Sequence, residues 1–423
     1  MSELKAGVGL SRKWDAREAG REVAETALEK LEGEKPKFFL LFSTIHYEKY
    51  GGFQELLNGV WEVLPEGTPL IGGTVAGFMN NYGCFTRGAT ALTVAYPNMD
   101  VAVGVGHNVK RNPLKAAEKS VSNVKKESRY DNRILIELLP TAVVPNIPGV
   151  GQKVVISSEK IGNQALKLLP KILYLNMGYD RADEVIEILT NTFGYQKIIG
   201  GCTMDDNRML RSYQFLNRDY FKNSLCIMQV DSDIKHSIYS SVPLERRKGS
   251  FMITKTDADL HVIREINHKG AKSALLEMLK WRDAHLPDSI YSFYKKIFYY
   301  PFGFEKKGQW HACMIGGFWG ENIILSVRAE KKDMQLLSLS IEKLFNTTKN
   351  NLQNIKENNA QMCFSVACET FMETLGNKIY EYQKLFSSYI DIPYLVVFMA
   401  GESVSTPEIG CHHLYEAINI WTM

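Results

Sequence analysis

The sequence lacks the features that mark nucleic-acid-binding, membrane and secreted proteins. Its 423 residues include 50 basic and 47 acidic side chains, a net charge of +3, so there is no electrostatic reason to expect nucleic acid or an anionic membrane surface as a partner. The most apolar stretches, residues 38–42 and 394–401, are too short to cross a bilayer. Residues 1–15 have no apolar run of the secretory kind. We therefore expect a cytoplasmic protein that binds neither nucleic acid nor membrane.

The sequence also has few cysteines and no motif of a common enzyme class. Its seven cysteines are scattered without a CxxC pair, which favours free buried thiols over a disulfide framework or a zinc site. Walker A, nucleophile-elbow and HExxH motifs are absent. Residues 411–413, CHH, offer metal or haem ligands, but neighbours on a strand point to opposite faces and do not converge. We expect no catalytic residues, no bound metal and no cofactor, and hence not an enzyme.

What the chain does contain is an alternation of short apolar runs with amphipathic stretches. Its 45% hydrophobic and 23% charged residues are ordinary for a globular protein, and its length allows two or three domains. Residues 36–44 form a continuous apolar run typical of a strand buried on both faces, and residues 51–67 resemble a helix closed by Pro and Gly. The alternation predicts a mixed α/β fold, with α+β as an alternative, in which helices flank mixed β-sheets.

One transition from strand to glycine recurs along the chain. Residues 70–83 are LIGGTVAGFMNNYG and residues 198–206 are IIGGCTMDD, each with paired glycines directly after an apolar strand. We expect three duplicated strand-helix-strand-glycine units, of which the second (171–201) opens with a strand and the third (362–403) is the weakest. After the first unit, two further strands are expected to form a hairpin with Pro-Asn at residues 97–98 as its turn.

A change of character divides the chain in two. Residues 241–250, SVPLERRKGS, form a polar and basic link, and a fresh strand-helix start follows them. We predict an N-terminal domain of residues 1–248 and a C-terminal domain of residues 249–423.

The glycine turns are the candidate ligand site. A double glycine at the carboxyl end of a strand lets a ligand approach the backbone closely, and successive N–H groups there form a nest for a carboxylate or phosphate. The alternative is that the glycines only turn each strand into the next. The acids that follow the turns either hold a ligand amine or cap the turn through its backbone. The predicted ligand-binding residues are Gly72, Gly73, Thr74, Gly77, Gly200, Gly201, Cys202, Thr203, Asp205, Cys368, Gly401 and Glu402.

The order of these features resembles the FIST proteins (F-box and intracellular signal transduction). Residues 7–31, GVGLSRKWDAREAGREVAETALEKL, are similar to the family's opening strand and Ala-rich helix. The LIGGTVAG and IIGGCTMDD segments resemble its glycine-rich turns, with Asp205 at the position of a recurrent acid. The segments YPFGF, FSVAC (ending at Cys368) and MAGES stand where the family's C-terminal domain has its Pro-x-Gly, Cys and Gly-Glu landmarks. Phe78, Phe371 and the final CHHLYEAINIW segment depart from the family pattern.

The resemblance implies an intracellular sensory or signal-transduction module. It would bind a small ligand such as an amino acid, whose carboxylate meets the backbone N–H groups of residues 72–77 or 200–203, and pass the signal to a partner protein in trans. One alternative is an interaction adaptor or scaffold without a small-molecule ligand. Another is a haem-binding gas sensor, for which the candidate iron ligands are His107, His311 and His413.

Overall fold

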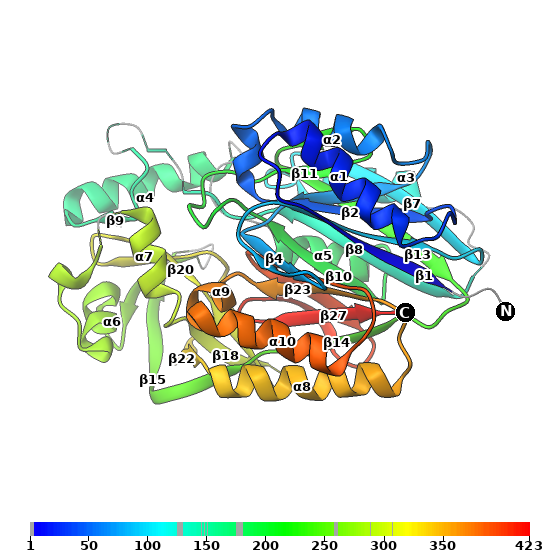
Figure 1. The fold of residues 1–423 in the computed structure, drawn as a ribbon. Coiled ribbons are helices and arrows are strands. Elements are labelled where there is room, and N and C mark those ends of the chain that lie inside the picture. Colours follow the sequence, from blue (N-terminus) through cyan, green and yellow to red (C-terminus); the bar gives the residue numbers. More distant parts are fainter. Residues whose placement is uncertain are drawn as a thin grey trace.

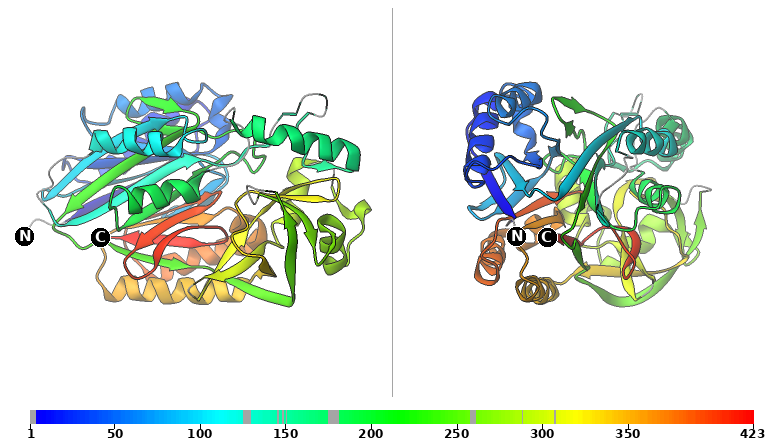
Figure 2. Two further views of the ribbon diagram at one scale, coloured as in Figure 1. Left: turned by 180° about the vertical axis from the view of Figure 1, so that it is seen from behind. Right: turned by 90° about the vertical axis from the view of Figure 1, so that its right-hand side faces the viewer.

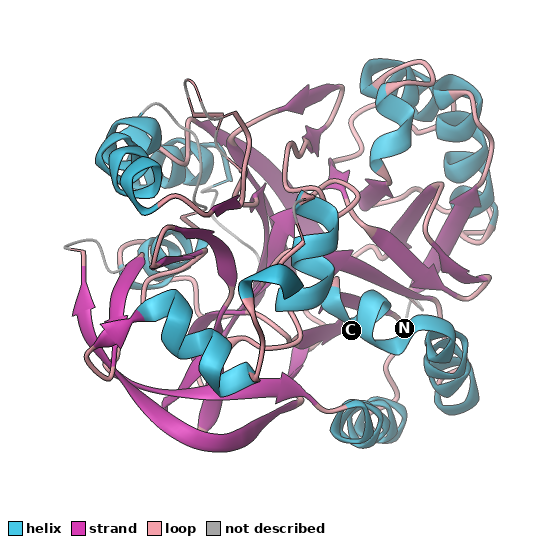
Figure 3. Cartoon of the chain, turned by 90° about the vertical axis from the view of Figure 1, so that its left-hand side faces the viewer, coloured by secondary structure: helices cyan, strands magenta, loops and turns pink. Residues whose placement is uncertain are grey.

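The computed structural model describes residues 4–124, 130–144, 146–147, 149, 151–174, 181–257, 261–287, 289–306 and 308–423. Within these residues the strands form four mixed sheets, and helices pack against them (Figures 1 and 3). The predicted mixed α/β class is therefore confirmed. In the same part of the chain, no helix combines the length and the apolar character that a membrane span requires.

Three of the sheets share one plan. In each, two parallel strands lie at the centre, antiparallel strands flank them, and helices cover the outer face. The first sheet contains, in spatial order, β1 (Lys5–Ser11), β6 (Ala89–Ala95), β2 (Phe38–Ser43), β3 (Leu70–Thr74), β11 (Gln214–Leu216) and β12 (Asp219–Phe221). Its helices are α1 (Ala16–Glu29), the 3-10 helix η1 (Ile45–Glu48) and α2 (Phe53–Trp61).

The second sheet corrects one of the predictions. Its strands, in spatial order, are β26 (Gly410–Leu414), β25 (Glu402–Thr406), β10 (Ile198–Thr203), β8 (Asn132–Pro140), β13 (Ser224–Ser232) and β7 (Met99–His107). Its helices are α3 (Pro113–Val124) and α5 (Ala182–Asn191). The strand expected at the start of residues 171–201 is wrong, because residues 171–174 continue the amphipathic helix α4 (Glu159–Tyr174). The parallel partner of β10 is β8 instead, and residues 175–180 lie outside the described residues.

The expected hairpin after the first unit is also wrong. β6 pairs with β1 and β2 in the first sheet, whereas β7 pairs with β13 in the second. The Pro-Asn turn therefore connects two sheets, because β6 and β7 each find an antiparallel partner from elsewhere in the chain.

The third sheet joins strands from both predicted domains. Its strands, in spatial order, are β14 (Ser237–Ser241), β27 (Ile418–Thr422), β23 (Cys363–Cys368), β24 (Tyr394–Met399), β4 (Gly77–Asn80) and β5 (Gly83–Phe85). Its helices are α8 (Ile341–Glu357), α9 (Thr370–Leu375), η3 (Gly376–Lys378) and α10 (Ile379–Tyr389). The division near residue 248 stays a prediction. Across it, β4 pairs with β24 and β14 pairs with β27.

The three sheets enclose a shared core. Seen from one end, three helix pairs (α1 with α2, α3 with α5, α8 with α10) lie outside the sheets (Figure 2). Side chains alternate along the central strands, so Phe42 of β2, Ile136 of β8 and Phe364 of β23 face inward into one cluster, with the rings of Phe42 and Phe364 stacked 5.7 Å apart. Their sequence neighbours face the helices, which explains the continuous apolar runs of these strands.

The fourth sheet lies at one end of this three-sheet body (Figure 1). It contains, in spatial order, β19 (Gln309–Cys313), β18 (Phe302–Lys306), β22 (Asp333–Leu339), β15 (Leu244–Thr256), β16 (Val262–Ile266), β21 (Asn322–Leu325), β20 (Ile315–Trp319) and β9 (Val155–Ile156), and β17 (Lys269–Gly270) pairs with β16. Its helices are α6 (Ala271–Leu279), the 3-10 helix η2 (Asp283–His285) and α7 (Ile290–Ile297). This sheet covers the end at which the parallel central strands terminate.

Candidate functional site

The strand that follows each glycine turn leaves its own sheet and joins a neighbouring one. β4 follows β3 but pairs with β24 of the third sheet. β11 follows β10 but pairs with β3 of the first sheet, and β25 follows β24 but pairs with β10 of the second. Each sheet thus contributes one strand to another: the first to the third, the second to the first and the third to the second. This arrangement brings the three turns together at the centre of the body.

Backbone hydrogen bonds connect the turns to one another. They run from the N–H of Met204 to the carbonyl of Thr74 (2.9 Å), from that of Cys202 to Gly401 (3.1 Å) and from that of Ala76 to Phe398 (3.0 Å). Backbone groups in the turns therefore satisfy one another. Whether the same turns also contact a ligand stays a prediction.

Close packing between the turns explains why glycine occupies two of these positions. A Cβ atom on Gly201 would lie 2.4 Å from the carbonyl oxygen of Gly401, and one on Gly73 would lie 2.5 Å from Cγ2 of Thr203 and 2.6 Å from the carbonyl oxygen of Tyr213. Neither position leaves room for a side chain. The recurrence of paired glycines thus has a structural cause in the meeting of the turns.

Asp205 caps the second turn. Its side chain accepts four backbone hydrogen bonds, from Arg208 (3.0 Å), Met209 (3.0 Å), Leu210 (3.0 Å) and Arg211 (3.3 Å). Burial raises the pKa of this carboxyl above its ordinary value, while the N–H groups act in the opposite direction. This is the capping role that the sequence allowed; its role as an amine ligand stays a prediction.

Buried acids also surround the third turn. Glu402 accepts hydrogen bonds from the N–H groups of Gly401 (3.1 Å) and Ala417 (3.2 Å), and Glu416 accepts one from the hydroxyl of Thr370 (2.7 Å). Burial raises the pKa of Glu402 well above its usual range and that of Glu416 to about 8.

The Cys368 thiol belongs to the same buried group. Oγ1 of Thr370 lies 3.1 Å from its sulfur. Burial and the neighbouring acids raise its pKa well above the ordinary value, so the sulfur stays a neutral thiol and is a poor nucleophile.

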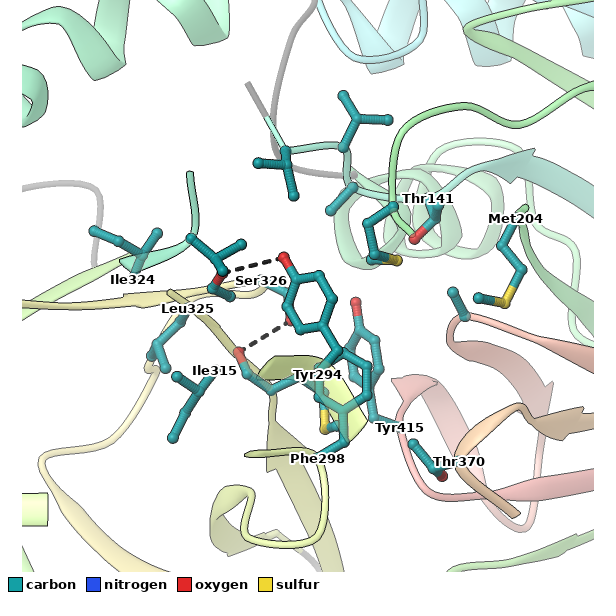
Figure 4. Close-up of a pocket in the computed structure, with 18 of the residues that line it drawn as sticks. Thr141, Met204, Tyr294, Phe298, Ile315, Ile324, Leu325, Ser326, Thr370 and Tyr415 are labelled. Carbon is teal, nitrogen blue, oxygen red and sulfur yellow. Dashed lines mark hydrogen bonds between the residues drawn. The ribbon is translucent and has the colours of Figure 1, made fainter. Parts of the chain in front are cut away.

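A cavity of about 80 Å³ lies where the central strands end, which is room for several water molecules at about 10–15 Å³ each. One wall consists of residues that directly follow or end the central strands: Thr141, Met204, Cys368, Glu369, Thr370 and Ala400. The other wall comes from α7, the residue that follows it, and the fourth sheet (Figure 4), and includes Tyr294, Phe298, Ile315, Leu325 and Ser326. The cavity therefore lies between the three-sheet body and the fourth sheet.

Among the residues that the structure describes, the cavity wall contains both satisfied polar groups and two buried ones without a partner. The hydroxyl of Tyr294 donates to the carbonyl of Gly316 (3.1 Å). In contrast, Oγ1 of Thr141 and Oε1 of Glu369 are buried and have no hydrogen-bond partner in the described part of the chain; the two residues are 1% and 3% exposed. Since an unmade buried hydrogen bond is costly, these two atoms are the polar groups of the lining residues that most need a partner.

Of the predicted ligand-binding residues, Cys368 lines the cavity. Thr203 and Gly401 are the immediate chain neighbours of the lining residues Met204 and Ala400. The sequence reasoning missed Glu369 and the α7 aromatics. An acid directly after the apolar strand β23 was the available signal for Glu369.

The histidines proposed for haem lie apart from the cavity. His107 ends β7, His311 is in β19 and His413 is in β26; no described lining residue is a histidine. Burial lowers the pKa of His413 to about 4, and its Nδ1 lies 3.0 Å from the hydroxyl of Ser403. Across the described ranges, no group of three or more His, Cys, Asp or Glu side chains is arranged to hold a metal ion. The haem alternative stays a prediction.

Comparison with known proteins yields one family match. Residues 37–269 match the family model of the FIST N domain, and a C-terminal FIST domain is not detected by a family model. A solved structure of cyanuric acid hydrolase from A. caulinodans aligns with 55% of this chain and 72% of its own, at 9% sequence identity and a TM-score of 0.27, which is too low to support an argument. No curated protein matches the chain.

Proposed function

The chain belongs to the FIST family of sensory and signalling domains, and from this premise we propose that it binds a small molecule such as an amino acid and passes the signal to a partner protein. The proposal assigns no catalytic step. It places the ligand in the cavity between the three-sheet body and the fourth sheet, beside the glycine turns.

The observation that carries this proposal is the composition of the cavity wall. Small-molecule sites are mostly apolar hollows with a few polar groups that fix orientation. Here the apolar part includes Met204, Phe298 and Leu325. Oγ1 of Thr141 and Oε1 of Glu369 are the buried polar atoms of the wall for which the described residues provide no partner. Burying a polar atom without a hydrogen-bond partner costs free energy. Two such atoms are therefore not expected in a cavity that is only a packing defect.

An amino acid with an apolar side chain suits these walls. The side chain would contact Met204, Phe298 and Leu325, all of which line the cavity. The exposed Lys153 also lines it and supplies a cation for the carboxylate. An acidic or basic amino acid would place a second charge against apolar groups, at a desolvation cost.

The position of the cavity suggests how binding is signalled. Tyr294 belongs to α7 and Phe298 directly follows that helix, so a ligand between them and the body bridges the two parts of the molecule. Binding there favours the arrangement in which α7 packs on the body, and it shifts the population towards that arrangement. A partner protein that recognises the α7 side of the molecule would detect the change.

Thermal unfolding in the presence of the twenty amino acids and a metabolite panel tests this function. A compound at 100 times its dissociation constant stabilises the folded protein by about 2.7 kcal/mol. Ala142, a partly exposed residue of the cavity wall, is changed to leucine to block the cavity, and Ala360→Leu outside it is the matched control. We expect at least one apolar amino acid to stabilise the wild type and Ala360→Leu, but not Ala142→Leu. Equal stabilisation of all three proteins, or of none, contradicts the proposal.

A further inference from the structure

Glu369 is the least satisfied acid beside the cavity. It is 3% exposed, it lines the cavity directly after β23, and its Oε1 has no hydrogen-bond partner among the described residues. The other buried acids of the region differ: Asp205 accepts four backbone N–H bonds and Glu402 accepts two. Glu369 therefore has an acceptor left over at the cavity wall.

Thr141 supplies a second acceptor in the same wall. It follows β8, is 1% exposed, and its Oγ1 also lacks a partner in the described part of the chain. The same cavity is also lined by the apolar and aromatic side chains of Met204, Tyr294 and Phe298. An ammonium group carries three N–H donors, and aromatic rings favour a nearby cation.

From this arrangement we infer that the cavity recognises a primary ammonium group on an apolar body, with Glu369 as its counter-ion and Thr141 as a second hydrogen-bond acceptor. The inference rests on the proposed function and names the ligand group that decides recognition there. The amine is required, and the carboxylate of an amino acid is secondary.

The charged side chains around Glu369 favour a cationic ligand, rather than a cation of the protein itself, as its partner. Glu373 of α9, Glu416 before β27 and Asp205 after β10 act on Glu369 as like charges. Lys295 of α7 acts on it with the opposite sign, but its ammonium group forms an ion pair with Glu373 at 3.1 Å. Burial and these acids raise the pKa of Glu369 well above its usual range. The protonated form of Glu369 is therefore favoured in the empty cavity more than in an exposed glutamate.

Binding of the ammonium group then releases one proton from the protein to the solvent. The neutral carboxyl of Glu369 releases its proton to solvent, and the carboxylate pairs with the ligand's ammonium group, so charge is balanced within the cavity. Affinity should consequently increase with pH while Glu369 is protonated in the empty protein and the ligand amine stays charged, by up to about tenfold per pH unit.

Three probes with one apolar body separate the contributions of amine and carboxylate. They are L-leucine, 3-methylbutylamine, which lacks the carboxylate, and 4-methylpentanoate, which lacks the amine. Calorimetric titration of the full chain at pH 6, 7 and 8 measures their affinities. Glu369→Gln keeps the shape and neutrality of the protonated acid, Thr141→Val removes the second acceptor, and Glu381→Gln on the exposed face of α10 is the matched control.

We expect 3-methylbutylamine to bind the wild type and Glu381→Gln with an affinity that increases with pH. Glu369→Gln should lose about 10- to 150-fold of that affinity, together with the pH dependence, because a charge-assisted hydrogen bond is removed. Thr141→Val should lower the affinity for 3-methylbutylamine by a smaller factor than Glu369→Gln does. Unchanged binding of the amine to Glu369→Gln overturns the inference.

The remaining outcomes distinguish the inference from the proposed function. If 4-methylpentanoate binds as tightly as L-leucine and the amine does not bind, the cavity is a ligand site but amine recognition is wrong. If L-leucine fails and the amine binds, amine recognition holds and the amino-acid part of the proposed function is wrong. Binding of none of the probes overturns amine recognition, and the wider panel then decides the proposed function separately.

Discussion

The backbone N–H of Met204 donates to the carbonyl oxygen of Thr74 across 2.9 Å. This bond joins the glycine turns of two units that lie far apart in the sequence. Because the Met204 side chain lines the cavity, the cavity wall depends on how these turns meet. The stability of the turns and the shape of the proposed site are therefore linked.

The packing of the turns predicts the effect of a single methyl group. Gly201→Ala should lower the free energy of unfolding by about 1–3 kcal/mol, since the new Cβ would lie 2.4 Å from the carbonyl oxygen of Gly401. Gly316→Ala is the control, because the nearest atom to its Cβ would be 3.6 Å away. Urea unfolding of both variants measures the difference; equal stability would show that the turns are loosely packed.

The capping role of Asp205 predicts a contrast between two neighbouring acids. Asp205→Ala leaves four backbone N–H groups without their acceptor. It should lower the free energy of unfolding by about 1–3 kcal/mol or more. Asp206→Ala removes only a surface ion pair with Arg208 at 3.3 Å, worth at most about 1 kcal/mol. Guanidinium unfolding of both variants tests this, and a larger loss for Asp206→Ala would contradict it.

Glu137 predicts a dependence of stability on pH. Burial in β8 raises its pKa from 4.5 to about 7. Between these values the unfolded chain releases the proton that the folded protein keeps, so this group lowers the free energy of unfolding as pH rises, by up to about 1.4 kcal/mol per pH unit. Glu137→Gln should therefore gain stability relative to the wild type from pH 4.5 to 7.

Urea unfolding across this pH range measures the Glu137 effect. The exposed Glu118 of α3 provides the control, because Glu118→Gln should keep a constant difference from the wild type. A constant difference for Glu137→Gln as well would mean that this carboxyl is ionised in the folded protein.

The bridging position of the ligand predicts where backbone dynamics change. If L-leucine binds between α7 and the body, amide hydrogen exchange in α7 should slow, because ligand contacts at Tyr294 and Phe298 oppose local opening. Exchange in α8, which lies on the outer face of the third sheet (Figure 1), should stay unchanged. Slower exchange in α8 with none in α7 would place the ligand elsewhere.

The sequence predicts the strands β2 and β23 and the glycine turns well, because the inward and outward faces of these strands are both apolar and the turns need glycine. It fails where pairing is set by distant chain segments. The apolar residues 171–174 suit a helix and a strand equally, and only the tertiary structure places them in α4. β6 and β7 are adjacent in sequence, yet each pairs in a different sheet.

The candidate site was partly within reach of the sequence. Its glycines and acids lie at the end of the sheets where the cavity is found, and Cys368 lines that cavity. Tyr294 and Phe298 carry no local pattern that separates a cavity wall from ordinary core. The importance of Glu369 depends on an oxygen that has no hydrogen-bond partner among the described residues, which no sequence pattern reveals.

A crystal structure of the full chain with L-leucine tests the central claim most directly. The account predicts ligand density in the cavity between α7 and the body, with the ligand nitrogen within hydrogen-bond distance of Oε1 of Glu369 and the side chain against Met204 and Leu325. Density at the glycine turns outside the cavity, or a ligand carboxylate rather than an amine facing Glu369, would contradict it.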